Sequence, residues 1–402
     1  MKIEDLFEAA QLEEMLDQGF VRRQVHPCLS YAILNYSELT QYSRTWNPVT
    51  RQCRGLIYNT STSEVVARPY RKFLNVTEPG AYEGRPDEPV VVTEKHDGSL
   101  GVGYPTQKGY AIATRGSFTS EQARHATILW EELYADRVTV PSGFTPLWEI
   151  VYPANRIVVS YGDFDDLILL GAVDIESGRS LTPADAADLI GWPGPVTEVF
   201  PYRTYAEALK TEPRPNKEGF VIHFPEADER VKLKYETYVV LHRLLTGCTA
   251  RRLWESLAVN ACAPYGDVKF MTRKLFLSPE RINGILTVGA AWLGPFTRDV
   301  PEEFRDWVLQ RVGEMENAIY RRRKDLLEAF HLLVVVAGMQ SRDGTPSRED
   351  SKVFAAAARE HAGDDFDLMM SMWRGHEIES TLWREIRPEH ELPYRAVDES
   401  VA

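Results

Sequence analysis

The chain contains few cysteines and no long apolar run. Its 402 residues include only four cysteines, whose spacing matches neither a disulfide framework nor a paired-cysteine metal site. The longest apolar run, Leu332 to Ala337, is much shorter than the roughly 18 residues of a membrane span. The first residues lack the basic, apolar and small-residue order of a signal peptide. We therefore expect a cytoplasmic protein, in the host cytoplasm if the source is viral, with reduced cysteines and no membrane partner.

Positive charge is also scarce, since 46 Lys and Arg face 59 Asp and Glu, for a formal net charge of −13. Non-specific nucleic-acid coats work by neutralising phosphates, so this composition argues against such a coat. Residues 241–340 nevertheless carry 14 Lys and Arg against 11 Asp and Glu. They include Arg321-Arg322-Arg323-Lys324, which is either a solvated helix face or a contact for an RNA backbone. The acidic tail from residue 341, with 8 Lys and Arg against 14 Asp and Glu, is expected to pack loosely.

The chain is long enough for two domains, and its 44% hydrophobic and 26% charged residues are typical of globular proteins. Helical spacing over Leu6 to Leu16 precedes a region, residues 30–240, that we predict to consist mainly of short strands with a few helices. The predicted strands are Val90–Thr93, Leu100–Tyr104, Tyr110–Thr114, Leu147–Val151, Ile157–Val159, Leu167–Val173, Gly219–Phe224 and Val231–Leu233; helices are predicted over Ser120–Ala135 and from Thr182 onward.

Beyond residue 240 the pattern becomes helical, because Phe304, Val308, Val312, Met315 and Ile319 recur at helical spacing. We predict an α+β fold in which antiparallel sheets are flanked by helices and followed by an all-helical C-terminal domain. The domains are predicted to span residues 1–243 and 244–402.

A lysine that ends an apolar strand is the first candidate for chemistry. Lys95 follows Val90-Val91-Val92 and precedes the Asp97-Gly98 turn. A lysine at a strand end can point into a cleft, and it attacks phosphorus or carbon when its surroundings hold it neutral. The alternative interpretation is an ordinary hairpin, because Asp-Gly is a common hairpin turn.

Two later lysines, Lys232 and Lys234, are predicted to share one face of a strand with Leu233 on the other. Such a pair in a cleft would form an anion site. Like charges disfavour the ammonium form, so we expect Lys95 to lose its proton more readily beside them. The same cations would stabilise charge on a phosphate under attack.

Glu149 and Glu218 are the candidate metal ligands, because Mg²⁺ prefers a few carboxylates and retained waters. The histidines His96, His125, His223 and His242 lack metal-ligand spacing and are interpreted as exposed or structurally bonded. The sequence also lacks a hydrolase elbow, a phosphate-binding P-loop and a dinucleotide fingerprint.

The ordered set of segments around Arg54, Lys72, Lys95, Glu149, Glu218 and Lys232 resembles the motifs of the ATP-dependent phage RNA ligase 1 family, which are covalent nucleotidyltransferases. The resemblance covers most of the first 240 residues. It implies that Lys95 becomes adenylated and that Asp97 and Gly98 shape its turn. It further implies nucleoside binding by Glu149, metal-assisted catalysis by Glu218, phosphate contacts by Lys232 and Lys234, and triphosphate binding by Arg54 and Lys72.

Four further positions follow from the resemblance. Tyr238 matches a tyrosine after the last motif, and Asp267 matches an acidic residue that approaches a second metal, although a solvated turn is the alternative. Arg115 stands where the family can show lysine, and the two side chains differ in reach and geometry. Leu74 replaces a second phenylalanine, so that only Phe73 is left for an aromatic contact.

The resemblance implies an RNA ligase that uses ATP and Mg²⁺ or Mn²⁺ to join 5′-phosphate and 3′-hydroxyl RNA ends, and we expect it to be a monomer. It would act through a lysyl-AMP and an adenylated RNA, and its helical domain would select the RNA, nicked tRNA among the possible substrates. The alternatives are a DNA ligase, a capping-type nucleotidyltransferase, or a non-catalytic RNA-binding module on the same scaffold.

Overall fold

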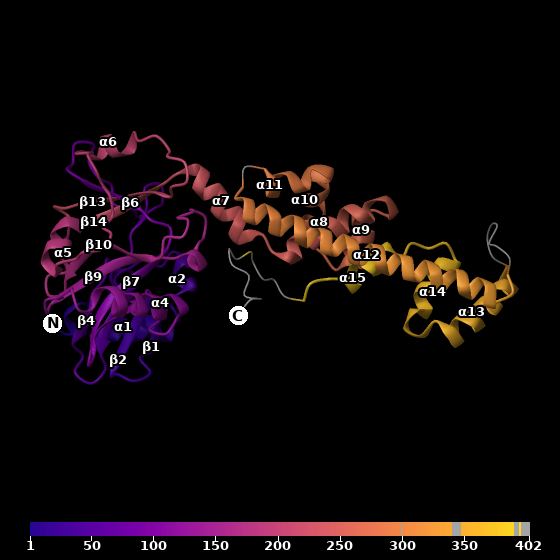
Figure 1. Ribbon diagram of the computed structural model, residues 1–402, viewed down its shortest axis with the longest axis horizontal. Coiled ribbons are helices and arrows are strands. Elements are labelled where there is room, and N and C mark those ends of the chain that lie inside the picture. The colour runs from indigo at the N-terminus through magenta and orange to yellow at the C-terminus, as the bar shows by residue number, and fades with distance from the viewer. Residues whose placement is uncertain (299, 340–346, 390–393, 395–402) are drawn as a thin grey trace. The chain divides into compact units, whose positions relative to one another are not determined.

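The computed structural model describes residues 1–298, 300–339, 347–389 and 394. It divides into two compact units between His242 and Arg243, which we call the N-terminal unit and the helical unit (Figure 1). In the N-terminal unit, three sheets account for the strands. The helical unit contains only helices among its described residues. The α+β class with an all-helical second part is therefore confirmed.

The first sheet has the strand order β1-β2-β3-β4, and all its pairs are antiparallel. It packs against α1 through a core that includes Leu12, Met15 and Leu34. Its elements are β1 (Val21–Val25), β2 (Tyr31–Tyr36), β3 (Arg54–Asn59) and β4 (Val65–Ala67), with η1 (Ile3–Asp5), α1 (Ala9–Asp17), α2 (Glu38–Ser43) and α3 (Pro48–Gln52).

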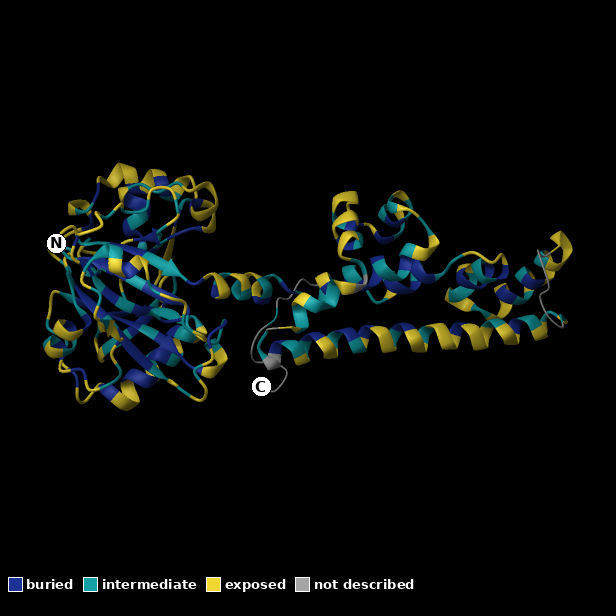
Figure 2. Cartoon of the chain, turned by 90° about the horizontal axis from the view of Figure 1, so that it is seen from above, coloured by how far each residue is buried: buried dark blue, intermediate teal, exposed yellow. Residues whose placement is uncertain are grey.

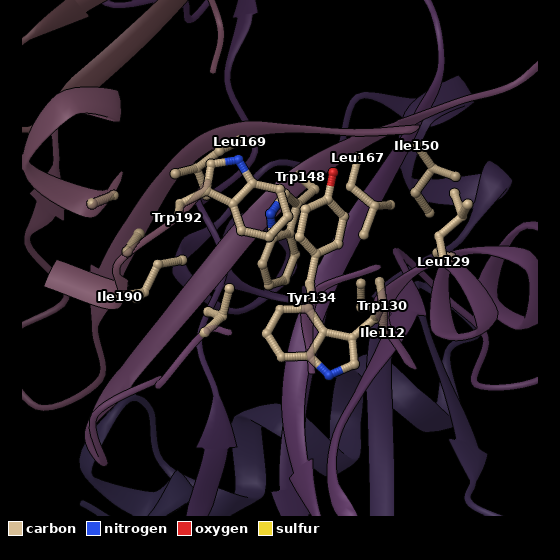
Figure 3. Close-up of a cluster of buried hydrophobic side chains, with 14 of the residues drawn as sticks. Ile112, Leu129, Trp130, Tyr134, Trp148, Ile150, Leu167, Leu169, Ile190 and Trp192 are labelled. Carbon is tan, nitrogen blue, oxygen red and sulfur yellow. The ribbon is translucent and has the colours of Figure 1, made fainter. Parts of the chain in front are cut away.

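The second sheet has the order β11-β10-β9-β7-β8 and is wholly antiparallel. Aromatic rings fill its core, where Trp130, Tyr134, Trp148 and Trp192 gather (Figure 3). Its strands are β7 (Ser99–Thr106), β8 (Gly109–Thr114), β9 (Phe144–Val151), β10 (Asp166–Asp174) and β11 (Ser180–Leu181). The associated helices are α4 (Glu121–Leu129), the π-helix η2 (Trp130–Tyr134), η3 (Pro153–Asn155) and α5 (Pro183–Ile190), whose N-cap is Thr182.

The third sheet has the order β12-β6-β13-β14-β5. Its β14–β5 pair is parallel, which departs from the predicted antiparallel pairing. The strands are β5 (Leu74–Asn75), β6 (Val91–Lys95), β12 (Val199–Phe200), β13 (Gly219–Phe224) and β14 (Glu229–Lys234); α6 (Tyr205–Leu209) precedes β13 and α7 (Glu236–Gly247) follows β14. Because β6 and β7 belong to different sheets, the Asp97-Gly98 turn joins two sheets and the hairpin interpretation is wrong.

The helical unit is built around the long helix α12 (Glu302–Val336), which has a buried side and an exposed side along its length (Figure 2). All five residues that predicted this helix are buried, from Phe304 to Ile319. The other helices are α8 (Ala250–Cys262), η4 (Ala263–Tyr265), α9 (Val268–Leu275), α10 (Pro279–Val288), η5 (Gly289–Leu293), α11 (Gly294–Thr297), α13 (Arg348–His361), η6 (Gly363–Asp365), α14 (Phe366–Trp373) and α15 (Glu379–Glu385). Within the described residues, no helix is both long and apolar enough to span a membrane.

The acidic tail differs from its prediction. Residues 347–389 form packed helices, with Phe354 stacked on Trp373 at a centroid distance of 4.4 Å and both rings buried. The loose packing predicted from composition is wrong for this part, because apolar side chains recur at helical spacing among the charges. Residues 341–346, 390–393 and 395–402 of the tail lie outside the described residues.

In the arginine quartet, Arg321 and Lys324 are exposed, as a solvated helix face predicts, whereas the other two arginines form ion pairs. Arg322 forms ion pairs with Asp365 (2.9 Å through Nη1) and Glu385 (2.8 Å), while Arg323 binds Glu379 at 2.7 Å. These pairs join α12 to η6 and α15 within the helical unit. Arg322 and Arg323 therefore hold the fold together, since their guanidinium groups already bind carboxylates.

Candidate active site

Lys95 lies in a cavity of about 600 Å³ in the N-terminal unit. The strand register explains its position, because Lys95 pairs with Gly219 and Thr93 with Val221, which in turn pairs with Lys232. Alternate residues of β6, β13 and β14 thus share one face of the third sheet. The second sheet supplies residues of the opposite wall, among them Ser99 and Glu149. We call this space the Lys95 cavity; its charged lining residues include Arg54, Glu94, Lys95, Arg115, Glu149, Arg230 and Lys232.

The Glu218 carboxylate lies between two lysines. Lys95 Nζ donates to its Oε2 at 2.7 Å, and Lys234 Nζ lies 2.7 Å from its Oε1. Glu218 is only 2% exposed, so both contacts act in a medium of low dielectric, where they are stronger than in water. The carboxylate therefore fixes the position of the Lys95 amine.

Asp97 holds the turn after Lys95 in place. Its Oδ2 accepts hydrogen bonds from the backbone amides of Val158 (2.7 Å) and Val159 (2.8 Å), and its Oδ1 accepts one from the Tyr238 hydroxyl (2.7 Å). The amides of Val158 and Val159 serve this carboxylate instead of a strand ladder, and the segment has no strand structure. The predicted strand Ile157–Val159 is therefore wrong. Burial and the Glu218 and Asp97 carboxylates raise the pKa of Tyr238, so its hydroxyl is a stable donor.

Gly98 lies against the neighbouring strand β9. A Cβ atom at this position would lie 2.5 Å from the Ile150 carbonyl oxygen, so only glycine fits without a shift of backbone. The Gly98 amide donates to Glu149 Oε1 at 3.0 Å. Burial raises the pKa of Glu149 to about 7, although Lys95 opposes this effect. The Glu149 side chain can thus be either neutral or charged near neutral pH.

Tyr36 on β2 brings two predicted cations together. Its hydroxyl accepts a hydrogen bond from Arg115 Nη1 at 2.7 Å and one from Lys72 Nζ at 3.4 Å. Burial alone would raise the pKa of Tyr36, but Arg115, Lys72 and Arg54 together lower it. The substitution of arginine for lysine at position 115 is therefore accommodated by a phenol that bonds the guanidinium directly.

Phe73 lies between two cations of the cavity. The Arg54 guanidinium is 5.3 Å and Lys232 Nζ is 5.2 Å from the centre of the Phe73 ring. Burial, with Lys72 and Lys95 nearby, lowers the pKa of Lys232 well below its ordinary value. A phosphate bound nearby would raise this pKa again, because a negative charge favours the ammonium form.

The structure gathers most of the predicted residues but not all of them. Lys232 lines the Lys95 cavity and Lys234 reaches Glu218, whereas Leu233 is only partly buried. Lys72 lines a neighbouring cavity. Asp267 belongs to the helical unit, where it is exposed and caps α9 by accepting from the Phe270 amide at 2.8 Å.

The predicted metal ligands do not form a ready-made cluster. Among the described residues, no group of three or more His, Cys, Asp or Glu side chains could hold a metal ion. His96, His125 and His223 contact Thr197, Asp165 and Asp228 respectively, in agreement with bonded imidazoles. The four cysteines are free, and all but the exposed Cys28 are buried.

Sequence reasoning missed Tyr36 and Arg230. Arg230 stands two positions before Lys232 and lines the same cavity, so the period-two rule that linked the two lysines could also have found it. Tyr36 gave no such signal, because it meets Lys72 and Arg115 only through contacts between distant segments.

Much of the N-terminal unit is similar to a known protein family. Residues 52–238 match the family model described as RNA ligase, and this stretch contains Arg54, Lys95, Glu149, Glu218 and Lys232. Residues 52–238 are therefore similar to the RNA ligase family. The predicted resemblance is thereby confirmed at the level of the family.

Two curated relatives match about half of the chain. A provisionally named RNA ligase of Thermovibrio ammonificans is 28% identical over 239 residues, which are 54% of this chain and 61% of that protein. A provisionally named bifunctional polynucleotide kinase/RNA ligase of the Autographa californica nuclear polyhedrosis virus is 26% identical over 237 residues, 52% of this chain and 33% of the viral protein. The chain thus matches less than two thirds of the length of either relative.

Solved structures of RNA ligases are more distant. An archaeal ATP-dependent RNA ligase shares 14% sequence identity, with a TM-score of 0.43 and coverage of 93% of this chain and 98% of that one. A mutant Naegleria gruberi RNA ligase with ATP and Mn shares 17% identity, with a TM-score of 0.31 and coverage of 38% and 52%.

Proposed function

We propose that this protein is an ATP-dependent RNA ligase that joins 5′-phosphate and 3′-hydroxyl RNA ends through a lysyl-AMP and an adenylated RNA. One observation carries the proposal: Lys95 Nζ, 2.7 Å from the buried Glu218 carboxylate, lies in a cationic cavity within the stretch that matches the RNA ligase family. The volume of about 600 Å³ falls within the usual range for small-molecule sites. The volume and the cationic lining of the cavity support ATP as its ligand.

In the first step, Lys95 transfers a proton to Glu218 and its amine attacks the α-phosphorus of ATP. A nitrogen–phosphorus bond forms, and the bond to pyrophosphate breaks. Arg54, Lys72 and Arg115 would hold the departing pyrophosphate, and Lys232 would neutralise charge at the phosphorus, which is the main catalytic contribution in such transfers. Asp97 and Gly98 act by positioning the turn that carries Lys95.

In the second step, an oxygen of the RNA 5′-phosphate attacks the adenylate phosphorus and the Lys95 amine leaves. In the third, the 3′-hydroxyl attacks the RNA phosphorus, and AMP departs as the new phosphodiester forms. Lys232 and Lys234 would neutralise the negative charge that develops in both transfers, so that the same cations would serve all three steps.

A divalent cation, Mg²⁺ or Mn²⁺, would neutralise phosphate charge when it is bound. Since the described residues contain no closed metal site, such an ion would rest mainly on the substrate phosphates and on Glu149, which lines the cavity. The oxygens of Glu218 bind two lysines and Asp267 caps a helix. Metal binding by either residue therefore requires a rearrangement.

The helical unit is proposed to select the RNA, with nicked tRNA as one candidate in a repair pathway, and the protein is proposed to act as a cytoplasmic monomer. A DNA ligase would carry a small β-barrel after the lysine domain, whereas the described residues of the helical unit contain no strand. A capping enzyme would use GTP. A non-catalytic module would form no covalent adduct with any nucleotide.

A joining assay with matched substrates tests the proposal. We expect the protein, given ATP and a divalent cation, to seal a nicked stem-loop RNA that carries a 5′-phosphate and a 3′-hydroxyl. We expect much slower sealing of the DNA equivalent, and none when GTP replaces ATP. Efficient sealing of DNA, or labelling by GTP but not ATP, would refute the proposed activity in favour of the two alternative enzymes.

A further inference from the structure

A second cavity, of about 240 Å³, adjoins the Lys95 cavity. Tyr70, Phe73 and Arg230 line both spaces. Five cationic residues line the second cavity against two carboxylates, an excess of three positive charges in a chain whose net charge is −13. We call it the arginine cavity; its charged residues are Arg68, Arg71, Lys72, Arg179, Asp228, Glu229 and Arg230.

The two carboxylates are already paired. Glu229 binds Arg51 at 3.0 Å and Arg71 at 3.2 Å. Asp228 binds His223 at 2.8 Å and Arg230 at 3.4 Å, and it also accepts from the Ser180 hydroxyl. The two acids hold neighbouring cations in place. Since five cationic residues line the cavity against only these two carboxylates, the cavity keeps its positive charge.

The guanidinium groups are held in place before any ligand binds. Arg68 donates to the carbonyl of Ile175 at 2.9 Å, Arg179 donates to that of Pro225 at 3.1 Å, and Arg230 lies 3.9 Å from the centre of the Tyr70 ring. Each of these contacts occupies a small part of a group that has five N–H donors. A ligand therefore meets ordered donors and loses little affinity to side-chain ordering.

We propose that the arginine cavity binds phosphate groups of the RNA strand beside its 5′ end, a proposal that rests on the proposed ligase function. Guanidinium forks match phosphate geometry, and the volume suits one or two phosphates but not a whole nucleotide. Arg71, 46% exposed, and the exposed Arg179 place part of the cavity at the surface. An RNA chain bound at such a site can continue outward into solvent, whereas a buried pyrophosphate has no chain that could continue.

The double variant Arg71→Gln/Arg179→Gln tests this assignment, because both side chains are exposed and Arg51 remains on Glu229. Arg124→Gln is the matched control, since Arg124 is also exposed and donates to a backbone carbonyl, that of Thr119, at 2.6 Å. The readouts are binding of a 5′-phosphorylated single-stranded RNA at several salt concentrations, sealing of pre-adenylated RNA, lysyl-AMP formation from ATP, and inhibition by pyrophosphate.

In the double variant we expect RNA binding and sealing to fall about tenfold, with a salt slope reduced by about 1.4 for two lost contacts to a single strand. Lysyl-AMP formation should stay within about twofold of wild type, and Arg124→Gln should change nothing. The proposal is overturned if lysyl-AMP formation and pyrophosphate inhibition weaken while RNA binding holds, because the cavity would then serve the triphosphate. Unchanged values in every assay would also overturn it. A wild-type protein that forms no lysyl-AMP would instead refute the proposed function.

Discussion

Lys95 and Lys234 are joined through one buried carboxylate, that of Glu218, with each Nζ 2.7 Å from a different oxygen. The two lysines are 20% and 25% exposed, whereas Glu218 is 2% exposed. The carboxylate thus holds two positively charged amines close together. The arrangement makes Glu218 a structural support, and in the proposed first step Glu218 is also the acceptor of the proton that Lys95 must lose.

Glu218→Gln should damage both roles. Without the negative charge, Lys95 and Lys234 repel each other, and we expect a loss of about 2 to 3 kcal/mol in the free energy of unfolding, somewhat below the cost of breaking a fully buried pair. Lysyl-AMP formation should fall at least about a hundredfold, within the usual contribution of a positioned proton acceptor. Urea unfolding and single-turnover labelling measure the two effects. The exposed Glu226 gives the control variant Glu226→Gln, and a Glu218→Gln protein that matches this control in both assays would contradict the account.

Gly98→Ala tests the close approach of the turn to β9. The added Cβ would meet the Ile150 carbonyl oxygen at 2.5 Å, so the turn must shift. We expect a loss of about 1 to 3 kcal/mol in stability, typical of overpacking, together with slower lysyl-AMP formation. Gly284→Ala in α10 is the comparison, since nothing lies within 4 Å of its Cβ position and the helix should gain up to about 1 kcal/mol. Wild-type labelling kinetics in Gly98→Ala would show that the turn tolerates movement.

The raised pKa of Glu149 predicts that the stability of the fold depends on pH. Burial raises its folded pKa to about 7 from a model-compound value of 4.5. Below pH 4.5 the Glu149 carboxyl is protonated in both the folded and the unfolded state, so it does not lower the free energy of unfolding. As the pH rises from 4.5 to 7, the unfolded state ionises first, so stability falls by at most about 1.4 kcal/mol per pH unit.

Glu149→Gln removes this titration and keeps an oxygen that can accept from the Gly98 amide. We therefore expect the variant to gain stability relative to wild type as the pH rises from 4.5 to 7, and the difference to level off above that range. Urea unfolding at a series of pH values measures it. A constant difference between the two proteins would show that Glu149 does not titrate in this range.

Arg322→Gln should weaken the helical unit without changing the affinity for RNA. Arg322 binds Asp365 and Glu385 from partly exposed positions, so we expect a loss of about 1 kcal/mol, near the upper end for exposed pairs. Lys324→Gln is the control, because its pair with Glu328 is more than 60% exposed on both sides and should contribute little. Thermal unfolding and RNA binding are the measurements. Weaker RNA binding with unchanged stability would restore the phosphate-contact interpretation.

Local patterns predicted much of the site, because they act over a few residues. The end of an apolar strand located Lys95, and period-two spacing placed Lys232 on the cavity face, where Arg230 follows by the same rule. Helical spacing located the buried stripe of α12. Family resemblance then connected segments that no local pattern could relate.

The contacts that local patterns could not predict join distant segments. The carboxylate of Asp97 accepts hydrogen bonds from the amides of Val158 and Val159, which a strand would have used for its ladder. Tyr36 meets its two cations across separate elements, and the acids that bind Arg322 lie more than forty residues away along the chain. In each case a polar group finds its partner only after the chain has folded.

The identity of the adenylated residue tests the central claim most directly. The protein is incubated with α-labelled ATP and a divalent cation, digested, and mapped by mass spectrometry, with Lys95→Arg and Lys217→Arg as paired variants. Lys217 stands two residues before Gly219 and pairs with Glu94. It serves as a neighbouring lysine with no proposed chemistry. The account predicts a single AMP adduct on Lys95 that disappears in Lys95→Arg and persists in Lys217→Arg. An adduct on another residue, or RNA joining by Lys95→Arg at the wild-type rate, would contradict it.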